Sequence, residues 1–277
     1  MLVVVVPSSI RNWVERKAIR NSWGRWLIDV SFTKSGSQQR TLRDSSSVGK
    51  VHNNTWSTIG NNGKLETSNK SKVAYEFDEL NSMLKSKLVF LLGRELRGNQ
   101  PSQSILKEQK LYGDLLVEDF VDSYQNLTLK SCFMLKYIRD KCRGAKFVAK
   151  IDDDIFLHVP NLHNTLLDKT SPDELLMGSL FCNSSPVKNP MDKWYCPNHM
   201  FTGDTYPNYL SGTGYVVSGN LMSPLLEAAL VTPLFHMEDI YVTGILAAKI
   251  GVHPTDDVGF SERTRGINPC LFQVSAF

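Results

Sequence analysis

The segment Lys146–Leu162, KFVAKIDDDIFLHVPNL, joins an apolar strand pattern to three consecutive acids. Its opening residues FVAKI are almost all apolar and predict a strand. Asp152, Asp153 and Asp154 follow directly. Neighbouring carboxylates repel one another and nothing in local folding requires three of them there, so the pattern indicates a positive charge that binds at this strand end.

The spacing of the three acids predicts which of their carboxylates point to the same side. Alternate residues of an extended segment point to the same face, so we expect Asp152 and Asp154 to converge on one cation while Asp153 points away. Carboxylate oxygens suit Mg²⁺ or Mn²⁺, and two of them leave coordination positions for a diphosphate. The alternative is a solvated acidic turn. The missing glycine and terminal glutamate exclude an EF-hand calcium loop.

Strand and helix patterns alternate through the first half of the chain. Apolar runs predict strands at 3–6 and 87–93 and a third ending at the acids, and helical spacing predicts helices over 12–24 and 126–142. A further helix and a short strand are expected around Gly113. This alternation is typical of a parallel α/β sheet. The acids therefore follow the carboxyl end of a strand, where open sheets bind ligands.

The second half has a mixed pattern. We expect a strand at 174–181, a long polar and aromatic loop over 183–209, a strand running into a helix over 212–230, and a helix over 236–252. Glu238 and Asp239 lie in the first turn of the last helix. The helix dipole favours acids there, and the same position suits a general base; the sequence alone leaves both interpretations open.

Composition limits the class of protein. The chain has 277 residues, 42% of them apolar, enough for one sizeable core or two fused half-domains. A net charge of +3 with scattered basic residues argues against nucleic-acid binding. Residues 31–72 are rich in Ser, Asn, Thr, Gly and Lys, and predict a polar surface insertion.

Cysteines and glycosylation signals favour an oxidising compartment. Cys182 and Cys196 flank a polar loop that a disulfide between them could close, and four Asn-x-Ser/Thr triplets occur in the chain. The first apolar run, Leu2–Val6, is too short to span a bilayer. As written, the chain is expected to be soluble or to lack its own targeting segment.

Six stretches occur in the order seen in one enzyme family. They are RKAIRNSWG (16–24), VFLLG (89–93), EQKLYGDLLVEDFVDSYQNLTLK (108–130), FVAKIDDDIF (147–156), YPNYLSGTGYVVS (206–218) and EDIYVTGILAAKIGV (238–252). The chain resembles the β-1,3-galactosyltransferases and β-1,3-N-acetylglucosaminyltransferases, glycosyltransferase family 31. The resemblance covers nearly all of the chain except about 31–72 and the last dozen residues.

The resemblance implies a GT-A type, Rossmann-like α/β fold with a mostly parallel central sheet flanked by helices. It implies one catalytic domain over 1–277, with a nucleotide-binding half at 1–160 and an acceptor-side half at 161–277. It also implies inverting transfer of galactose or N-acetylglucosamine from UDP-galactose or UDP-GlcNAc to the 3-hydroxyl of an acceptor glycan on protein or lipid, with Mn²⁺ as cofactor. The implied location is the lumenal side of the Golgi membrane, held by an anchor absent from this sequence.

Site residues carry over by motif position. Asp154 and Asp152 are the implied metal ligands, and Asp239 is the implied base, with Glu238 as the fallback. The remaining residues implied on the nucleotide and sugar sides are Asp152, Asp153, Lys150, Arg20, Trp194, Tyr195, Tyr209, Gly212 and Gly214.

One departure motivates an alternative function. No histidine follows His253, whereas the family continues with a histidine that is expected to complete the metal site. The alternative is therefore an inactive sugar-binding relative. A metal-dependent phosphohydrolase is a third possibility, but it leaves the other five stretches unexplained. The remaining histidines show no metal-ligand spacing, and we expect most to be structural or at the surface.

Overall fold

The computed structural model describes residues 1–27, 57–59, 65–67, 85–95, 101–167, 169 and 174–260. The chain divides into two compact units, Met1–Ile28 with Ser86–Phe277, and Asp29–Lys85. In the smaller unit β2 (Ser57–Ile59) pairs antiparallel with β3 (Leu65–Thr67). Most of the polar insertion expected over 31–72 lies outside the described residues.

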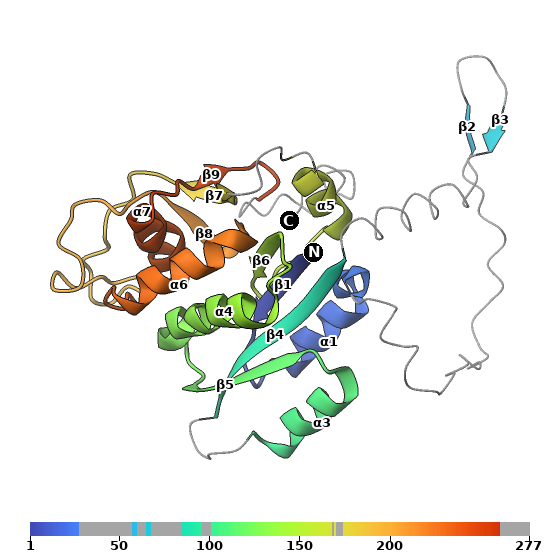
Figure 1. Ribbon diagram of the computed structural model, residues 1–277, viewed down its shortest axis with the longest axis horizontal. Helices are drawn as coiled ribbons and strands as arrows, with labels where there is room; N and C mark the ends of the chain where they lie inside the picture. The colour runs from blue at the N-terminus through green and yellow to red at the C-terminus, as the bar shows by residue number, and fades with distance from the viewer. Residues whose placement is uncertain are drawn as a thin grey trace. The chain divides into compact units, whose positions relative to one another are not determined.

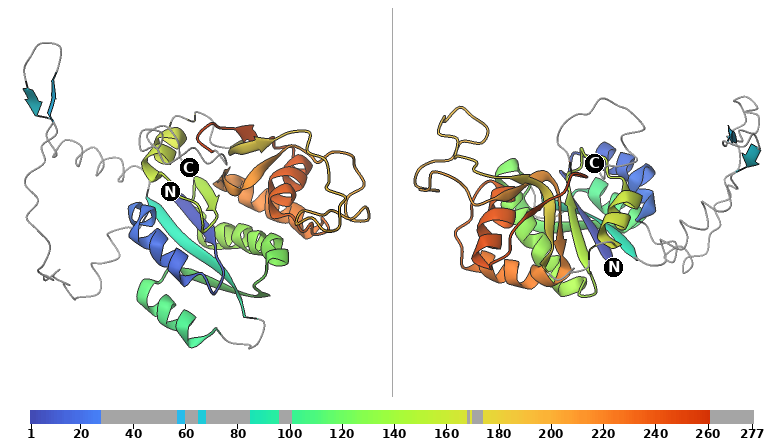
Figure 2. Two further views of the ribbon diagram at one scale, coloured as in Figure 1. Left: turned by 180° about the vertical axis from the view of Figure 1, so that it is seen from behind. Right: turned by 90° about the horizontal axis from the view of Figure 1, so that it is seen from above.

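The larger unit is built on a seven-stranded sheet of order β5-β4-β1-β6-β8-β7-β9 (Figures 1 and 2). The strands are β1 (Leu2–Pro7), β4 (Ser86–Arg94), β5 (Leu115–Val121), β6 (Phe147–Ile151), β7 (Leu176–Phe181), β8 (Tyr209–Ser218) and β9 (Thr255–Asp256). Strands β5, β4, β1 and β6 run parallel, β8 runs antiparallel to both β6 and β7, and β9 runs parallel to β7. The expected α/β architecture with a mostly parallel sheet is confirmed.

Helices cover both faces of the sheet (Figures 1 and 2). The α-helices are α1 (Trp13–Asn21), α3 (Gln103–Tyr112), α4 (Leu127–Lys141), α5 (Val159–Leu167), α6 (Met222–Leu230) and α7 (Ala247–Lys249). The short 3₁₀ turns are η1 (Trp23–Trp26), η3 (Tyr124–Asn126) and η5 (Gly219–Leu221), and η6 (Ile240–Leu246) is a π-helix. Among these described elements, no helix is long and apolar enough to cross a membrane.

Strand β1 shows why the sheet lies between two cores. Val3 and Val5 pack with residues of α4 and α6, whereas Leu2, Val4 and Val6 pack with residues of α1, α3 and α5. Successive side chains of a strand point to opposite faces, so a continuous apolar run supplies both cores at once. The first strand was predicted from its run of β-branched residues.

The predicted elements match the observed ones with three omissions. The expected strands and helices of the first half, the strand at 174–181, and the strand that leads into α6 are all present. The pattern did not predict α5, the short β9, or the antiparallel pairing of β8 with β6. Much of the helix expected over 236–252 is a π-helix, η6.

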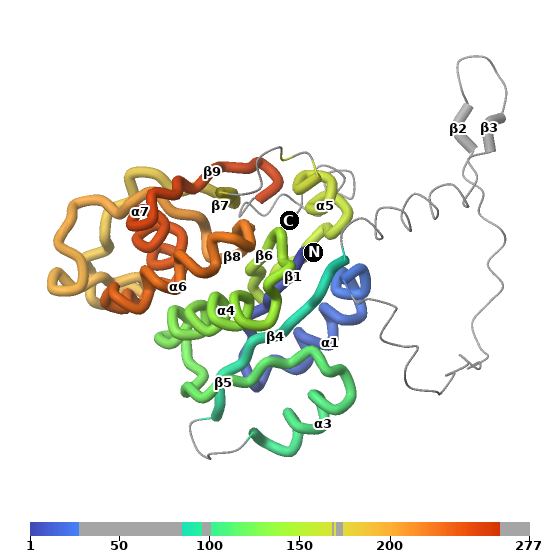
Figure 3. The backbone as a smooth tube through the Cα atoms, viewed as in Figure 1, coloured from blue at the N-terminus to red at the C-terminus, as the bar shows by residue number. Residues whose placement is uncertain are grey.

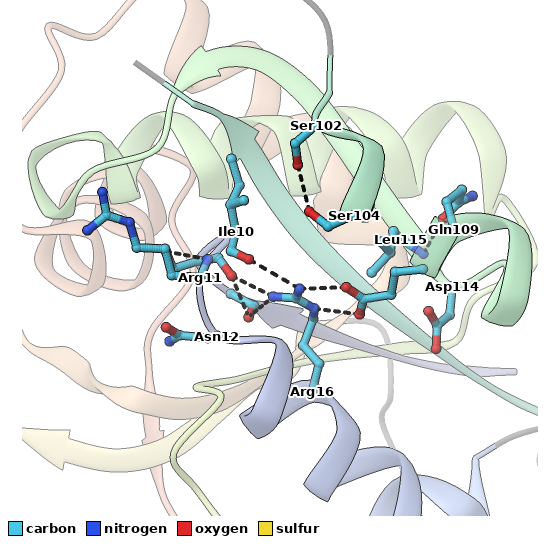
Figure 4. Close-up of polar contacts among 12 residues, drawn as sticks. Ile10, Arg11, Asn12, Arg16, Ser102, Ser104, Gln109, Asp114 and Leu115 are labelled. Atoms are coloured by element: carbon cyan, nitrogen blue, oxygen red, sulfur yellow. Dashed lines mark hydrogen bonds and ion pairs between the residues drawn. The ribbon is translucent and has the colours of Figure 1, made fainter. Parts of the chain in front are cut away.

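A buried ion-pair network ties α1 to α3 (Figure 4). The Arg16 side chain is fully buried, and its Nε and Nη2 atoms lie 2.8 and 2.7 Å from the two carboxylate oxygens of Glu108. Arg20 contacts the same Glu108 at 2.8 Å and Asp114 at 2.7 Å. Burial alone would raise the pKa of Glu108, but hydrogen bonds and charge from the two guanidinium groups lower it. The acid therefore stays ionised between two cations.

We predict that Glu108→Leu lowers the free energy of unfolding by about 3–5 kcal/mol, because it leaves the buried Arg16 guanidinium without its carboxylate. Urea denaturation measures the change. The matched control is Arg94→Ala, which breaks an ion pair whose Asp119 side chain is 93% exposed and is expected to cost less than about 1 kcal/mol. Equal losses in the two variants would contradict the proposed role of the network.

Candidate active site

A pocket of about 750 Å³ opens where β6 and β8 meet. Its walls come from the β6–α5 turn, from β8, from the start of α4, from the long β7–β8 connection, and from the segment that begins the helix at Glu238. The β7–β8 connection extends past α7 (Figure 3). A cavity of this size is in the range of small-molecule sites.

The three consecutive acids separate as their alternation predicts. Asp152 and Asp154 line the pocket. Asp153 is not among the pocket residues; its Oδ2 accepts hydrogen bonds from Ser8 Oγ at 2.7 Å and from Asn12 Nδ2 at 3.0 Å. Asp153 therefore fixes the β6–α5 turn against the β1–α1 turn, and the other two acids stay available to a ligand.

A buried cation, Lys150, connects the two groups of acids in the pocket. Its Nζ lies 2.5 Å from Asp152 Oδ1 and 3.7 Å from Glu238 Oε2, and it donates a hydrogen bond to the carbonyl of Gly212. Burial alone would lower the pKa of Lys150, but Asp152 and Glu238 outweigh that effect and raise it. Lys150 is therefore charged at neutral pH, and it lies between the strand-end acids and the helix-start acids.

The adjacent acids Glu238 and Asp239 have different environments. Glu238 is buried, and its Oε1 accepts hydrogen bonds from Ser131 Oγ at 2.7 Å and from the Tyr215 hydroxyl at 2.6 Å. Asp239 is half-buried in the pocket wall, and its Oδ1 accepts a hydrogen bond from the Ile240 backbone amide at 2.9 Å. Glu238 is thus already bonded to protein groups, which leaves Asp239 as the carboxylate better placed to meet a ligand.

The pKa of Asp239 is raised to about 6, first by burial and second by the neighbouring charge of Glu238. The Ile240 amide and the Lys150 charge oppose this rise in part. A carboxylate with a pKa near 6 is mostly ionised at pH 7 and is a stronger base than an ordinary aspartate.

A glycine allows β8 to approach the Asp239 carboxylate closely. A Cβ atom on Gly212 would lie 3.3 Å from Asp239 Oδ2. Thr243 Oγ1 donates to the Asp239 carbonyl at 2.6 Å and accepts from the Leu210 amide at 2.8 Å. The π-helix that follows Asp239 is therefore bonded to the same strand, as is common for such helices near functional sites.

The structure places most of the predicted site residues around one pocket. The pocket residues are Lys150, Asp152, Asp154, Trp194, Tyr209, Gly212, Gly214, Glu238 and Asp239. Arg20, Asp153 and Tyr195 are not among them. Arg20 is instead engaged by Glu108 and Asp114 between α1 and α3, so we do not retain it on the nucleotide side.

Sequence reasoning missed two polar groups in the pocket wall, Tyr206 and His236. Within the described residues, the Tyr206 hydroxyl and both His236 ring nitrogens are buried and have no hydrogen-bond partner. Burial raises the pKa of Tyr206 and keeps its hydroxyl neutral. His236 precedes the acid pair by two residues, a position that would have justified including it among the candidates.

The Cys182–Cys196 disulfide that the sequence allowed does not form, because the structure holds both residues as free thiols. Cys182 is exposed just after β7, whereas Cys196 is fully buried with Tyr206 in the core on the α4 side of the sheet. The side chain of Cys196 packs as a small apolar group, so the loop ends without a covalent link.

The donor set fits a divalent ion in part. Asp154 is exposed and Asp152 is half-buried, so both can offer oxygen atoms to an ion in the pocket. Among all the residues that the structure describes, the pocket included, no group of three or more His, Cys, Asp or Glu side chains is arranged as a metal site. Two carboxylates suit an ion that also binds diphosphate oxygens and water, as Mg²⁺ and Mn²⁺ do in nucleotide sites.

The family model and the curated relatives that the chain matches are all described as sugar transferases. The family model described as "Galactosyltransferase" matches residues 55–258. The chain is 34% identical over 193 residues to mouse and human "Beta-1,3-galactosyltransferase 1", covering 69% of this chain and 58% of theirs. It is 32% identical over 205 residues to human "Lactosylceramide 1,3-N-acetyl-beta-D-glucosaminyltransferase", covering 72% of this chain and 53% of that protein. The chain thus matches little more than half the length of these relatives.

Among solved structures, a 4-diphosphocytidyl-2C-methyl-D-erythritol synthase matches with a TM-score of 0.38 and 11% identity, over 68% of this chain and 80% of that one. A likeness at this level carries no inference about function.

Proposed function

The chain belongs to the galactosyltransferase family, and we propose that it transfers a hexose from a UDP-sugar to the 3-hydroxyl of an acceptor glycan with inversion at the anomeric carbon. The donor sugar is galactose or N-acetylglucosamine, the two sugars that its relatives' names carry. The observation that supports the proposal is that Asp239, a carboxylate whose pKa is raised to about 6, shares one pocket with Asp152 and Asp154.

Each acid has one role in the proposed reaction. Asp239 accepts the proton from the acceptor's 3-hydroxyl, and the resulting oxygen nucleophile attacks the anomeric carbon from the face opposite UDP. The bond from that carbon to the diphosphate oxygen breaks, and UDP leaves with the bonding electron pair. Glu238 is a positioning residue, because its hydrogen bonds with Ser131 and Tyr215 hold it in place beside Asp239.

The strand-end acids serve the leaving group. Asp154 and Asp152 would hold Mn²⁺, and the bound ion supplies Lewis-acid stabilisation of the charge that grows on the diphosphate. Lys150 holds Asp152 in place through an ion pair, with 2.5 Å between Lys150 Nζ and Asp152 Oδ1.

The domain organisation and the cellular location are also proposals. We propose one catalytic domain over 1–277, with its donor half at 1–160 and its acceptor half at 161–277, acting on the lumenal side of the Golgi membrane.

A non-catalytic sugar-binding role is the second candidate, because Lys150 already engages Asp152 and so competes with a metal ion for that carboxylate. The same pocket would then bind sugar without turning it over. The raised pKa of Asp239 favours the enzyme, because binding alone does not require a base near neutrality.

We predict that Asp239→Asn lowers acceptor-dependent UDP release by at least about a hundredfold, because an amide cannot take the acceptor proton. Release is measured with UDP-galactose and UDP-GlcNAc, Mn²⁺ and a panel of acceptor sugars. The control Asp140→Asn alters an exposed acid at the end of α4 and is expected to retain wild-type release. Near-normal turnover in Asp239→Asn would remove the base role from this residue.

The rate of transfer should rise with pH through about 6 and level off above it, because Asp239 has a raised pKa and acts only when ionised. In Glu238→Gln the loss of the like charge lowers that pKa, so the rising limb should move to lower pH. Initial rates from pH 5 to 8 at saturating Mn²⁺ measure both curves. A limb that stays in place in Glu238→Gln would show that Glu238 does not influence the base.

We predict that EDTA abolishes UDP release, and that Asp154→Ala raises the Mn²⁺ concentration needed for half-maximal rate by at least about tenfold, since one of two protein ligands is gone. Asp154 is exposed, so its loss should change the free energy of unfolding by less than about 0.5 kcal/mol. Asp204→Ala, at another exposed acid, is the matched control. An unchanged Mn²⁺ dependence in Asp154→Ala would place the ion elsewhere.

A further inference from the structure

Three side chains form a small exposed cluster on the pocket wall. Tyr124 comes from η3, and Lys193 and Trp194 come from the β7–β8 connection; all three line the pocket. Lys193 Nζ lies 4.7 Å from the centre of the Tyr124 ring and 5.8 Å from that of Trp194. The Tyr124 and Trp194 side chains are 46% and 54% exposed. Two exposed aromatic rings and one ammonium group therefore lie together.

This cluster, Tyr124, Lys193 and Trp194, lies on the wall that carries the acid pair. Helix α4, which begins just after Tyr124, contacts the segment before Asp239 twice: Thr128 Oγ1 donates to the Phe235 carbonyl at 2.6 Å, and Ser131 Oγ donates to Glu238 at 2.7 Å. Phe235 packs in the core on the α4 face of the sheet.

The turn that carries Asp154 packs on the other face of the sheet. Ile155, next to Asp154, packs against the core that contains Phe260, and its carbonyl accepts a hydrogen bond from Trp23 Nε1 at 3.2 Å. The turn that carries Asp154 and the aromatic cluster are thus attached to different cores. A donor held at Asp154 would leave the cluster to the acceptor.

We propose that Tyr124, Lys193 and Trp194 form an outer acceptor subsite, which stacks the second sugar of an acceptor glycan of two or more residues. The proposal rests on the proposed function and assigns a substrate class to it. Aromatic faces bind the C–H face of a pyranose ring, and the ammonium group donates hydrogen bonds to its hydroxyl oxygens. The first sugar then lies deeper, with its 3-hydroxyl at Asp239.

The Lys193 ammonium group also holds the exposed Tyr124 and Trp194 rings near each other. A cation lying between two aromatic faces attracts both of them, so the cluster is partly ordered before a glycan binds. Preorganised groups lose less freedom on binding than mobile ones. The subsite therefore favours longer acceptors over monosaccharides.

The experiment compares kcat/KM for paired acceptors: galactose with lactose, and N-acetylglucosamine with N,N′-diacetylchitobiose. In the wild type the disaccharide is expected to be preferred. In Trp194→Ala the ratio of disaccharide to monosaccharide should fall by at least about tenfold, and Tyr124→Ala should lower it in the same direction. Trp194→Phe keeps an aromatic face and should retain most of the ratio. Trp13→Ala is the matched control, an exposed tryptophan with Lys17 Nζ 5.2 Å from its ring centre.

A second measurement separates this proposal from the proposed function. Saturation-transfer NMR of lactose and N,N′-diacetylchitobiose, with UDP present and no donor sugar, should show contact at the reducing-end ring in the wild type and its loss in Trp194→Ala. If that contact is seen but no acceptor is glycosylated, the subsite stands and the catalytic proposal fails. If transfer occurs but the ratio is unaltered in Trp194→Ala, or if only the KM for the UDP-sugar rises, the outer acceptor subsite is overturned.

Discussion

One buried ammonium group, Lys150, makes this arrangement of acids possible. Asp152 lies 2.5 Å from it on one side and Glu238 lies 3.7 Å from it on another. Without that charge, carboxylates from β6 and from the start of the last helix would repel one another across a partly buried pocket. Lys150 lies on β6 itself, two residues before Asp152, so the strand that ends at the acids also carries the cation that stabilises them.

The topology of the sheet then decides which chemistry each acid can perform. Strands β1 and β6 are adjacent and parallel, so their following turns meet, and Asp153 joins them through Ser8 and Asn12. The antiparallel β8 brings Gly212 beside β6 from the other direction, and Gly212 lets Asp239 approach. Asp152 and Asp154 therefore share a pocket with Asp239 although they come from opposite halves of the chain.

Much of this could be predicted from the sequence. Alternation along the strand end separated Asp153 from Asp152 and Asp154, and continuous apolar runs predicted the first strands of the sheet. The contacts that depend on distant partners could not be predicted. Arg20 carried a charge that suited a phosphate, but Glu108 and Asp114 engage it. The loop cysteines had a plausible spacing, but burial of Cys196 keeps the two thiols apart in different environments. Tyr206 and His236 could be identified only from the structure. Both line the pocket, and the Tyr206 hydroxyl and the His236 ring nitrogens are buried without a hydrogen-bond partner among the described residues.

A crystal structure of the protein with UDP and Mn²⁺, recorded with anomalous scattering from manganese, tests the central claim most directly. The account predicts a manganese peak within about 2.5 Å of an Asp154 oxygen, with diphosphate oxygens completing its shell and the Asp239 carboxylate facing open space where an acceptor hydroxyl would lie. A peak bound by Glu238 and Asp239, or a diphosphate seated away from the strand-end acids, would contradict it.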